Sequence, residues 1–398
     1  MLLLLMALVG CTCSSDPTVL AAYTEARDAA LAEPAPPPAD WSPDALLQLS
    51  PPLFEALVLE ALKSRGTITR ELEVARGVIL APSVAVEAVS VRATPACEAC
   101  LQATITMRGQ LRFQAVVRGQ VPIEVEAVTV VRTTPERTDG GGWELVAVTD
   151  AVEGVAVRVP GIPQALVRLG HERLRGWVER ELHELGPKVM GTLPASFPIA
   201  AMRLVPAGEG LEVELHTTAV APAPLLGAPV RVSEGWQLDV SIGSAVSLVR
   251  TALFREGPRT RFEVVGVPEA VRLDGSRLTA EGRVWRTSPP GWWRDATFVG
   301  ELRVELGSAG NEVVVSPRSL EVTGLSEGAM WADPLAAAAE ATLLGEVQKR
   351  LHRRIGGVRQ TEVRGQSLTA EVTEIFGTEG GSVLRVRGSL AVAGAPTD

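Results

Sequence analysis

The sequence predicts an α+β fold of two tandem modules, each a long, highly twisted antiparallel sheet wrapped around a long amphipathic helix. Three observations lead to this prediction: a helical pattern in residues 163–185, an unusually long alternating pattern in residues 101–117, and a second copy of the helix and its following hairpin. The predicted organisation is a signal peptide at 1–10, an acylated tether with a Pro-rich linker at 11–43, and modules at 44–222 and 223–398.

The N-terminus carries a short apolar run, MLLLLMALVG, that ends immediately before Cys11. A run of this length is too short to span a bilayer as a mature helix and is typical of a signal-peptide core. The residues LVGC at positions 8–11 resemble the lipobox of bacterial lipoproteins, in which the signal is cut before the cysteine and the cysteine is acylated. The resemblance implies a lipid anchor at Cys11, and the alternative is an ordinary signal peptide with a chance cysteine.

The residues after Cys11 are predicted to form a tether. Thr12 follows the cysteine, and by resemblance to lipoproteins the absence of Asp there favours the outer membrane of the bacterial cell envelope. Cys13 is either a second acylation candidate or a free thiol. Residues 18–33 are compatible with a short helix, and residues 33–39 (EPAPPPA) with a semi-rigid polyproline spacer.

Composition limits the function classes. The chain of 398 residues is 46% hydrophobic but only 4% aromatic, so its cores are predicted to consist of Val, Leu and Ala. A net charge of -9 argues against nucleic acid as a partner, because phosphates require a basic surface. Motifs of the G-x-S-x-G, P-loop and H-E-x-x-H types are absent from the sequence, which predicts a protein that is not an enzyme and uses no cofactor.

The first long helix is predicted at residues 163–185. Leu174, Trp177, Val178 and Leu182 recur with a period of 3.6 residues and therefore form one apolar stripe. Proline opens the segment and Gly-Pro closes it, as at many helix ends.

A second helix is predicted at residues 334–355, where Leu343, Val347 and Leu351 form the equivalent stripe. Each helix is followed by a predicted hairpin, at residues 199–220 and 367–392. The order of helix and hairpin is therefore the same in both halves, which indicates two copies of one unit. The alternative is the coincidence expected of any protein that mixes helices with hairpins.

The clearest strand covers residues 101–117. Alternate residues, including Leu111 and Phe113, are apolar and share one face, interrupted only by Gly109. A strand of this length spans roughly 50 Å and belongs to a long twisted sheet with one apolar face. In the second half, residues 296–306 show the same alternation, with Phe298 and Leu302 on one face.

Cys97 and Cys100 form a C-x-x-C motif between two predicted strands. Zinc would need two further ligands, and the four histidines show no spacing that supplies a pair, so no metal site is predicted. A redox dithiol and a disulfide that closes the turn both remain open. An oxidising compartment outside the cytoplasm favours the disulfide.

The order of short apolar helix, long antiparallel strands, long helix and closing hairpin, duplicated, resembles the tubular lipid-binding superfamily, which includes the bactericidal permeability-increasing and lipid-transfer proteins. The resemblance implies an apolar groove between sheet and helix that binds or passes a lipid or another hydrophobic small molecule. The basic tip of antibacterial members is absent, so charge-based capture of lipopolysaccharide is not expected. The candidate groove residues are Leu111, Phe113, Leu174, Trp177, Val178, Leu182, Phe298, Leu302, Leu343, Val347 and Leu351.

The same apolar pattern is also expected of a helix and sheet that pack tightly together. The alternative function is therefore a structural or scaffold lipoprotein with closed cores that binds a protein partner.

Overall fold

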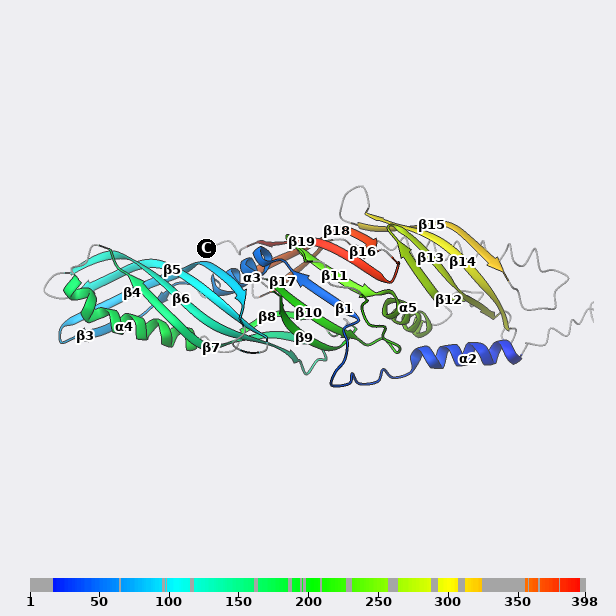
Figure 1. The fold of residues 1–398 in the computed structure, drawn as a ribbon, viewed down its shortest axis with the longest axis horizontal. Coiled ribbons are helices and arrows are strands. Elements are labelled where there is room, and N and C mark those ends of the chain that lie inside the picture. The colour runs from blue at the N-terminus through cyan, green and yellow to red at the C-terminus, as the bar shows by residue number, and fades with distance from the viewer. Residues whose placement is uncertain are drawn as a thin grey trace, which may run out of the picture.

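The computed structural model shows three antiparallel sheets arranged along one elongated body (Figure 1). It describes residues 17–63, 66–94, 97, 99–114, 118–160, 164–184, 188–193, 195, 198–207, 210–226, 231–256, 264–287, 293–306, 312–323, 355–356, 358–363, 366–378 and 380–393.

The first sheet contains the long strands predicted in the first half. Its order is β2-β4-β5-β6-β7-β8, with β3 paired to β4. The strand bounds are β2 Ile68–Thr69, β3 Leu72–Ala75, β4 Val78–Ala93, β5 Cys100–Gln114, β6 Arg118–Arg137, β7 Trp143–Arg158 and β8 Lys188–Leu193. The strand predicted at 101–117 is confirmed over residues 101–114 as part of β5, whose 15 residues make it much longer than the usual five or six, while residues 115–117 lie outside the described residues.

The central sheet combines strands from both halves of the sequence, in the order β17-β18-β19-β11-β1-β10-β9. The strand bounds are β1 Ala45–Leu49, β9 Ile199–Ala207, β10 Gly210–Thr217, β11 Trp236–Ser241, β17 Val358–Val363, β18 Gln366–Gly377 and β19 Val383–Ala393. The two predicted hairpins are β9–β10 and β18–β19. They flank β1 and β11, which pair with each other at the middle of the sheet.

The third sheet lies in the second half, in the order β12-β13-β14-β15-β16. The strand bounds are β12 Val264–Asp274, β13 Arg277–Thr287, β14 Trp293–Leu306, β15 Glu312–Thr323 and β16 Ile355–Gly356. Four helices occur in the part of the chain that the structure describes: α2 Pro17–Leu31, α3 Pro51–Lys63, α4 Gln164–His183 and α5 Ile242–Glu256. None of these helices is both long and apolar enough to cross a membrane.

The predicted fold class is wrong. The described chain is mostly β, with three sheets instead of one sheet per module, and no sheet is wrapped around a long amphipathic helix. α4 instead packs against β7 and β3, which lie toward opposite edges of the first sheet. The helix predicted at 334–355 lies outside the described residues.

The physical reason is that alternation specifies which face of a strand is buried but not which strand is its neighbour. β1 pairs with β10 of the first hairpin along one edge, and β11 pairs with β19 of the second hairpin along one edge. The other edges of β1 and β11 pair with each other, which satisfies their backbone N–H and C=O groups.

The largest core lies between the first sheet, α3, α4 and one face of the central sheet. A second, smaller core joins α2 and α5 to the third sheet. In Figure 1, α2 runs beside the third sheet at the end of the body opposite to α4. Part of the segment predicted to be a tether, residues 11–43, is therefore a helix that packs against the third sheet.

Candidate functional site

One apolar pocket opens between α4 and the first sheet, and we call it the α4 pocket. Nine of its ten lining side chains are apolar, and Glu181 is the exception. The apolar members are Leu62 from α3, Ile68 from β2, Val84 and Val86 from β4, Ile105 and Met107 from β5, and Trp177, Val178 and Leu182 from α4.

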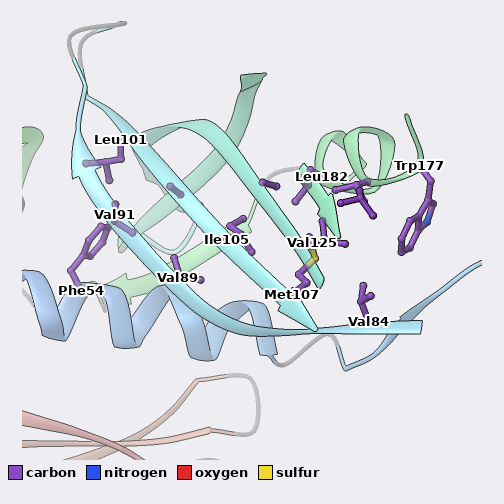
Figure 2. Packing of buried hydrophobic residues seen from close by; sticks show 14 of the residues in the cluster. Phe54, Val84, Val89, Val91, Leu101, Ile105, Met107, Val125, Trp177 and Leu182 are labelled. Atoms are coloured by element: carbon purple, nitrogen blue, oxygen red, sulfur yellow. The ribbon is translucent and has the colours of Figure 1, made fainter. Parts of the chain in front are cut away.

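The helical wall of the pocket follows from the period of α4. Trp177, Val178 and Leu182 stand at positions i, i+1 and i+5, so their side chains lie on one side of the helix. All three are buried, and Figure 2 shows Leu182 and Trp177 on the helix above the strands that carry Met107 and Val84. The stripe therefore faces the apolar side of the sheet.

The sheet wall follows from the pairing of β4 with β5. Val86 is the register partner of Met107, and Val84 is the partner of Gly109. Since alternate residues of β5 face inward, Gly109 leaves that face without a side chain at one position. A Cβ atom at Gly109 would collide with the backbone carbonyl of Ser83, so the close approach of the two strands requires glycine here.

The polar part of the pocket is a small group on its rim. Glu181 accepts a hydrogen bond from the indole Nε1 of Trp177 at 3.2 Å and another from Nη1 of Arg70, also at 3.2 Å. The Arg70 side chain is 43% exposed and that of Glu181 is 23% exposed, so solvent screens their ion pair. A ligand with an apolar body and a polar end would match this arrangement.

The pocket is narrow. The space that the centre of a water-sized sphere can reach is about 20 Å³, which is room for about one water molecule. This volume is far below the roughly 300–1,000 Å³ that is usual for small-molecule sites. A hydrocarbon chain would therefore enter only after α4 or its side chains move.

The predicted groove residues fall into separate places. Trp177, Val178 and Leu182 line the α4 pocket, while Leu174 and Leu111 are buried in the same core without lining the pocket.

The two predicted phenylalanines pack over glycines of neighbouring strands. Phe113 faces Gly119 and Phe298 faces Gly282, and in each pair a Cβ atom on the glycine would meet the ring. Such aromatic–glycine pairs fill the gap that a glycine leaves in a sheet. Leu302 lies on β14 of the third sheet and is half-buried.

Four predicted sites lie outside the described residues. They are the acylation candidate Cys11 and the second-helix residues Leu343, Val347 and Leu351.

Seven pocket residues were not predicted: Leu62, Ile68, Val84, Val86, Ile105, Met107 and Glu181. A signal existed for Ile105 and Met107, which share the alternating face of Leu111. Ile68 belongs to a strand of two residues, which is too short to show a period.

Cys97 and Cys100 are joined by a disulfide in the turn between β4 and β5. Ala99, within this turn, adopts a positive φ of 60°. The carboxylate of Asp150 lies close to the two sulfur atoms, but sulfur atoms joined in a disulfide are not thiolates, the form of cysteine that binds a metal. That the pair is oxidised in the protein's native compartment stays a prediction.

Neither a protein-family model nor a curated protein matches the chain. Among solved structures, it is similar to lipopolysaccharide binding protein, with 10% identity and a TM-score of 0.39 over 88% of this chain and 99% of the other. It is also similar to P47 of Clostridium botulinum E1, with 10% identity and a TM-score of 0.43 over 88% and 99%. P47 of Clostridium botulinum A2 gives 8% identity and a TM-score of 0.38 over 87% and 97%. At these TM-scores the likenesses carry no inference about a ligand.

Proposed function

We propose that the protein binds a lipid or another hydrophobic small molecule in the α4 pocket, without covalent chemistry. The observation that carries the proposal is the chemistry of the pocket, whose lining among the described residues consists of nine apolar side chains and the partly exposed Glu181. An apolar wall gains free energy by removing hydrocarbon from water, at about 25 cal/mol per Å² of buried apolar surface. In this proposal the polar end of the ligand would lie near Glu181 and Arg70, which bond to each other and are partly exposed to solvent.

We further propose that Cys11 is acylated and anchors the protein to the bacterial outer membrane. The support is the LVGC sequence at positions 8–11. Two or three acyl chains would hold the protein firmly at the membrane, because each buried methylene contributes about 0.8 kcal/mol. The pocket would then lie near a bilayer, which is a source of hydrophobic ligands.

Substitution of Val86 tests the pocket. Val86 is half-buried on β4 and lines the pocket, so Val86→Phe adds a ring to the pocket wall without replacing a fully buried side chain. We expect a fluorescent fatty acid to bind this variant at least about tenfold more weakly, a difference of about 1.4 kcal/mol. The matched control is Val152→Phe, on β7 of the same sheet, half-buried in the same core but outside the pocket. Equal binding by the two variants would contradict the proposal.

The second candidate function is a structural or scaffold lipoprotein that binds a protein partner. The enclosed volume of only about 20 Å³ favours it. Native mass spectrometry of protein extracted from its own membrane separates the two functions. A stoichiometric lipid beyond the acyl mass on Cys11 is expected for the ligand-binding protein, and a mass that contains the acyl group alone for the scaffold.

A further inference from the structure

The second core contains a concentration of aromatic residues in a chain that has few. The only tyrosine of the sequence, Tyr23, lies on α2 and meets Phe254 of α5 and Trp285 of β13. The ring centroids are 5.8 Å apart for Tyr23–Phe254, 5.7 Å for Tyr23–Trp285 and 6.0 Å for Phe254–Trp285. We call these three residues the α2 site. They belong to a core separate from the one that contains the α4 pocket.

Among the described residues, the helix that covers this site packs through one stripe of buried side chains. α2 buries Val19, Tyr23 and Ala30, which recur at helical spacing, and Tyr23 is the only large ring among them. Its other faces are in contact with solvent, and Leu20 and Leu31 are 40% and 38% exposed. One such stripe is a small interface for a helix of 15 residues.

The connection between α2 and the sheets allows the helix to separate. Residues 32–44 contain no helix or strand, and they include a run of prolines. At the C-terminal end of α2, the hydroxyl of Thr251 on α5 donates a hydrogen bond to the carbonyl of Ala30 at 2.8 Å. α2 can therefore leave the third sheet without breaking any strand pairing.

Two buried donors near the α2 site lack hydrogen-bond partners in the part of the chain that the structure describes. They are the indole Nε1 of Trp285, a residue only 2% exposed, and Nε of Arg250. Arg250 stands one turn before Phe254 on α5, and therefore on the same side of that helix. A buried donor without a partner costs free energy, and α2 supplies no acceptor to either group.

We propose that the α2 site is a second binding site, for a single-chain anionic amphiphile such as a fatty acid, and that the chain's own α2 occupies it in the absence of ligand. The hydrocarbon would replace Tyr23 between Phe254 and Trp285, and the carboxylate would accept the two unpaired hydrogen bonds. α2 is then a displaceable cover. The site is separate from the α4 pocket, because the two belong to different cores and α2 and α4 lie at opposite ends of the body (Figure 1).

A disulfide that locks α2 in place tests the proposal on the full chain. The hydroxyl of Thr251 bonds to the main-chain carbonyl of Ala30, so these neighbouring positions are chosen for the pair Ala30→Cys and Thr251→Cys, and mass spectrometry checks that the crosslink forms. The Val86→Phe change is included to suppress binding in the α4 pocket. The probe is a fatty acid with a fluorophore at the end of its chain, and the same protein is measured oxidised and after mild reduction. We expect at least about tenfold tighter binding after reduction.

Tyr23→Ala, combined with Val86→Phe but without the added cysteine pair, provides the second test. Removing the ring weakens α2 as a competitor, so we expect probe affinity to rise several-fold. The matched control is Leu20→Ala, which shortens an exposed side chain of the same helix and should leave affinity unchanged. A protein without the two added cysteines is reduced in parallel, which measures any effect of reducing the chain's own Cys97–Cys100 disulfide on probe binding. Equal probe binding by the oxidised and reduced forms would overturn the proposal, whatever the outcome at the α4 pocket.

Discussion

The central sheet contains a buried ion pair between Asp239 and Arg385. The two residues are register partners on β11 and β19, and both guanidinium–carboxylate contacts, Nε–Oδ1 and Nη2–Oδ2, measure 2.7 Å. Both side chains are almost fully removed from solvent. The hydrogen bonds to Asp239 raise the pKa of Arg385 above its usual value, although burial opposes the shift. The guanidinium is therefore charged at every physiological pH.

Removing one partner leaves the other charge buried and unpaired. We expect Arg385→Met to lower the free energy of unfolding by about 3–5 kcal/mol, and the double change with Asp239→Leu to restore most of it. Because the pKa of Arg385 is raised, its contribution is present below the pKa of the unfolded state and is lost only in strong alkali. The decrease in the free energy of unfolding caused by Arg385→Met should therefore be the same at about pH 6 and about pH 9.

Urea denaturation measures this effect. The matched control is Arg175→Met, which removes an ion pair with Glu179 on the exposed side of α4 and should leave the midpoint unchanged. Equal midpoints for the Arg385 and Arg175 variants would show that the buried pair contributes no more than a surface pair.

Strand β5 depends on a glycine at the point of closest approach to β4. The Cβ atom of an alanine at 109 would overlap the carbonyl oxygen of Ser83, which belongs to the backbone and cannot rotate away. We expect Gly109→Ala to lower the free energy of unfolding by about 1–3 kcal/mol. Gly154→Ala on β7 is the control, because a Cβ atom there meets nothing within 4 Å. Thermal unfolding of the two variants gives the comparison, and equal melting temperatures would contradict this account of Gly109.

The elements with a clear period were predictable from the sequence. The alternation around Leu111 gave β5 and its apolar face, and the 3.6-residue stripe gave α4 with Trp177, Val178 and Leu182. These side chains repeat because one face of each element is buried.

Strand pairing and the remainder of the pocket were not predictable. β1 is five residues long, and nothing in its sequence indicates that it pairs with both β10 and β11. Leu62 and Ile68 reach the pocket through the path of the chain between α3 and β4, which is set by tertiary packing and not by a local pattern. The duplicated order of elements was visible, but it did not reveal that the two hairpins share one sheet.

A row of polar side chains crosses the central sheet from the first half of the sequence to the second. Gln48 donates to Glu212 at 2.9 Å, Gln237 to Gln48 at 3.4 Å, and Arg387 to Gln237 at 2.9 Å and to Glu374 at 3.1 Å. The row runs through β10, β1, β11, β19 and β18. Gln48 and Gln237 are buried, so leaving either without its partner would cost free energy. The central sheet therefore couples the two halves through backbone and side-chain hydrogen bonds.

This coupling predicts that the halves unfold together. Leu182→Ala removes a buried side chain from α4 and should cost about 2–5 kcal/mol. If the central sheet makes one cooperative unit, the slowest-exchanging amides of β13 and β14 in the third sheet will exchange faster by the same factor as those of β5 and β6. Hydrogen exchange followed by mass spectrometry resolves these peptides. Leu226→Ala serves as the control, because Leu226 is 70% exposed and its removal should change no peptide. Acceleration confined to the first sheet would show instead that the halves open independently and that the hydrogen-bonded row does not transmit stability.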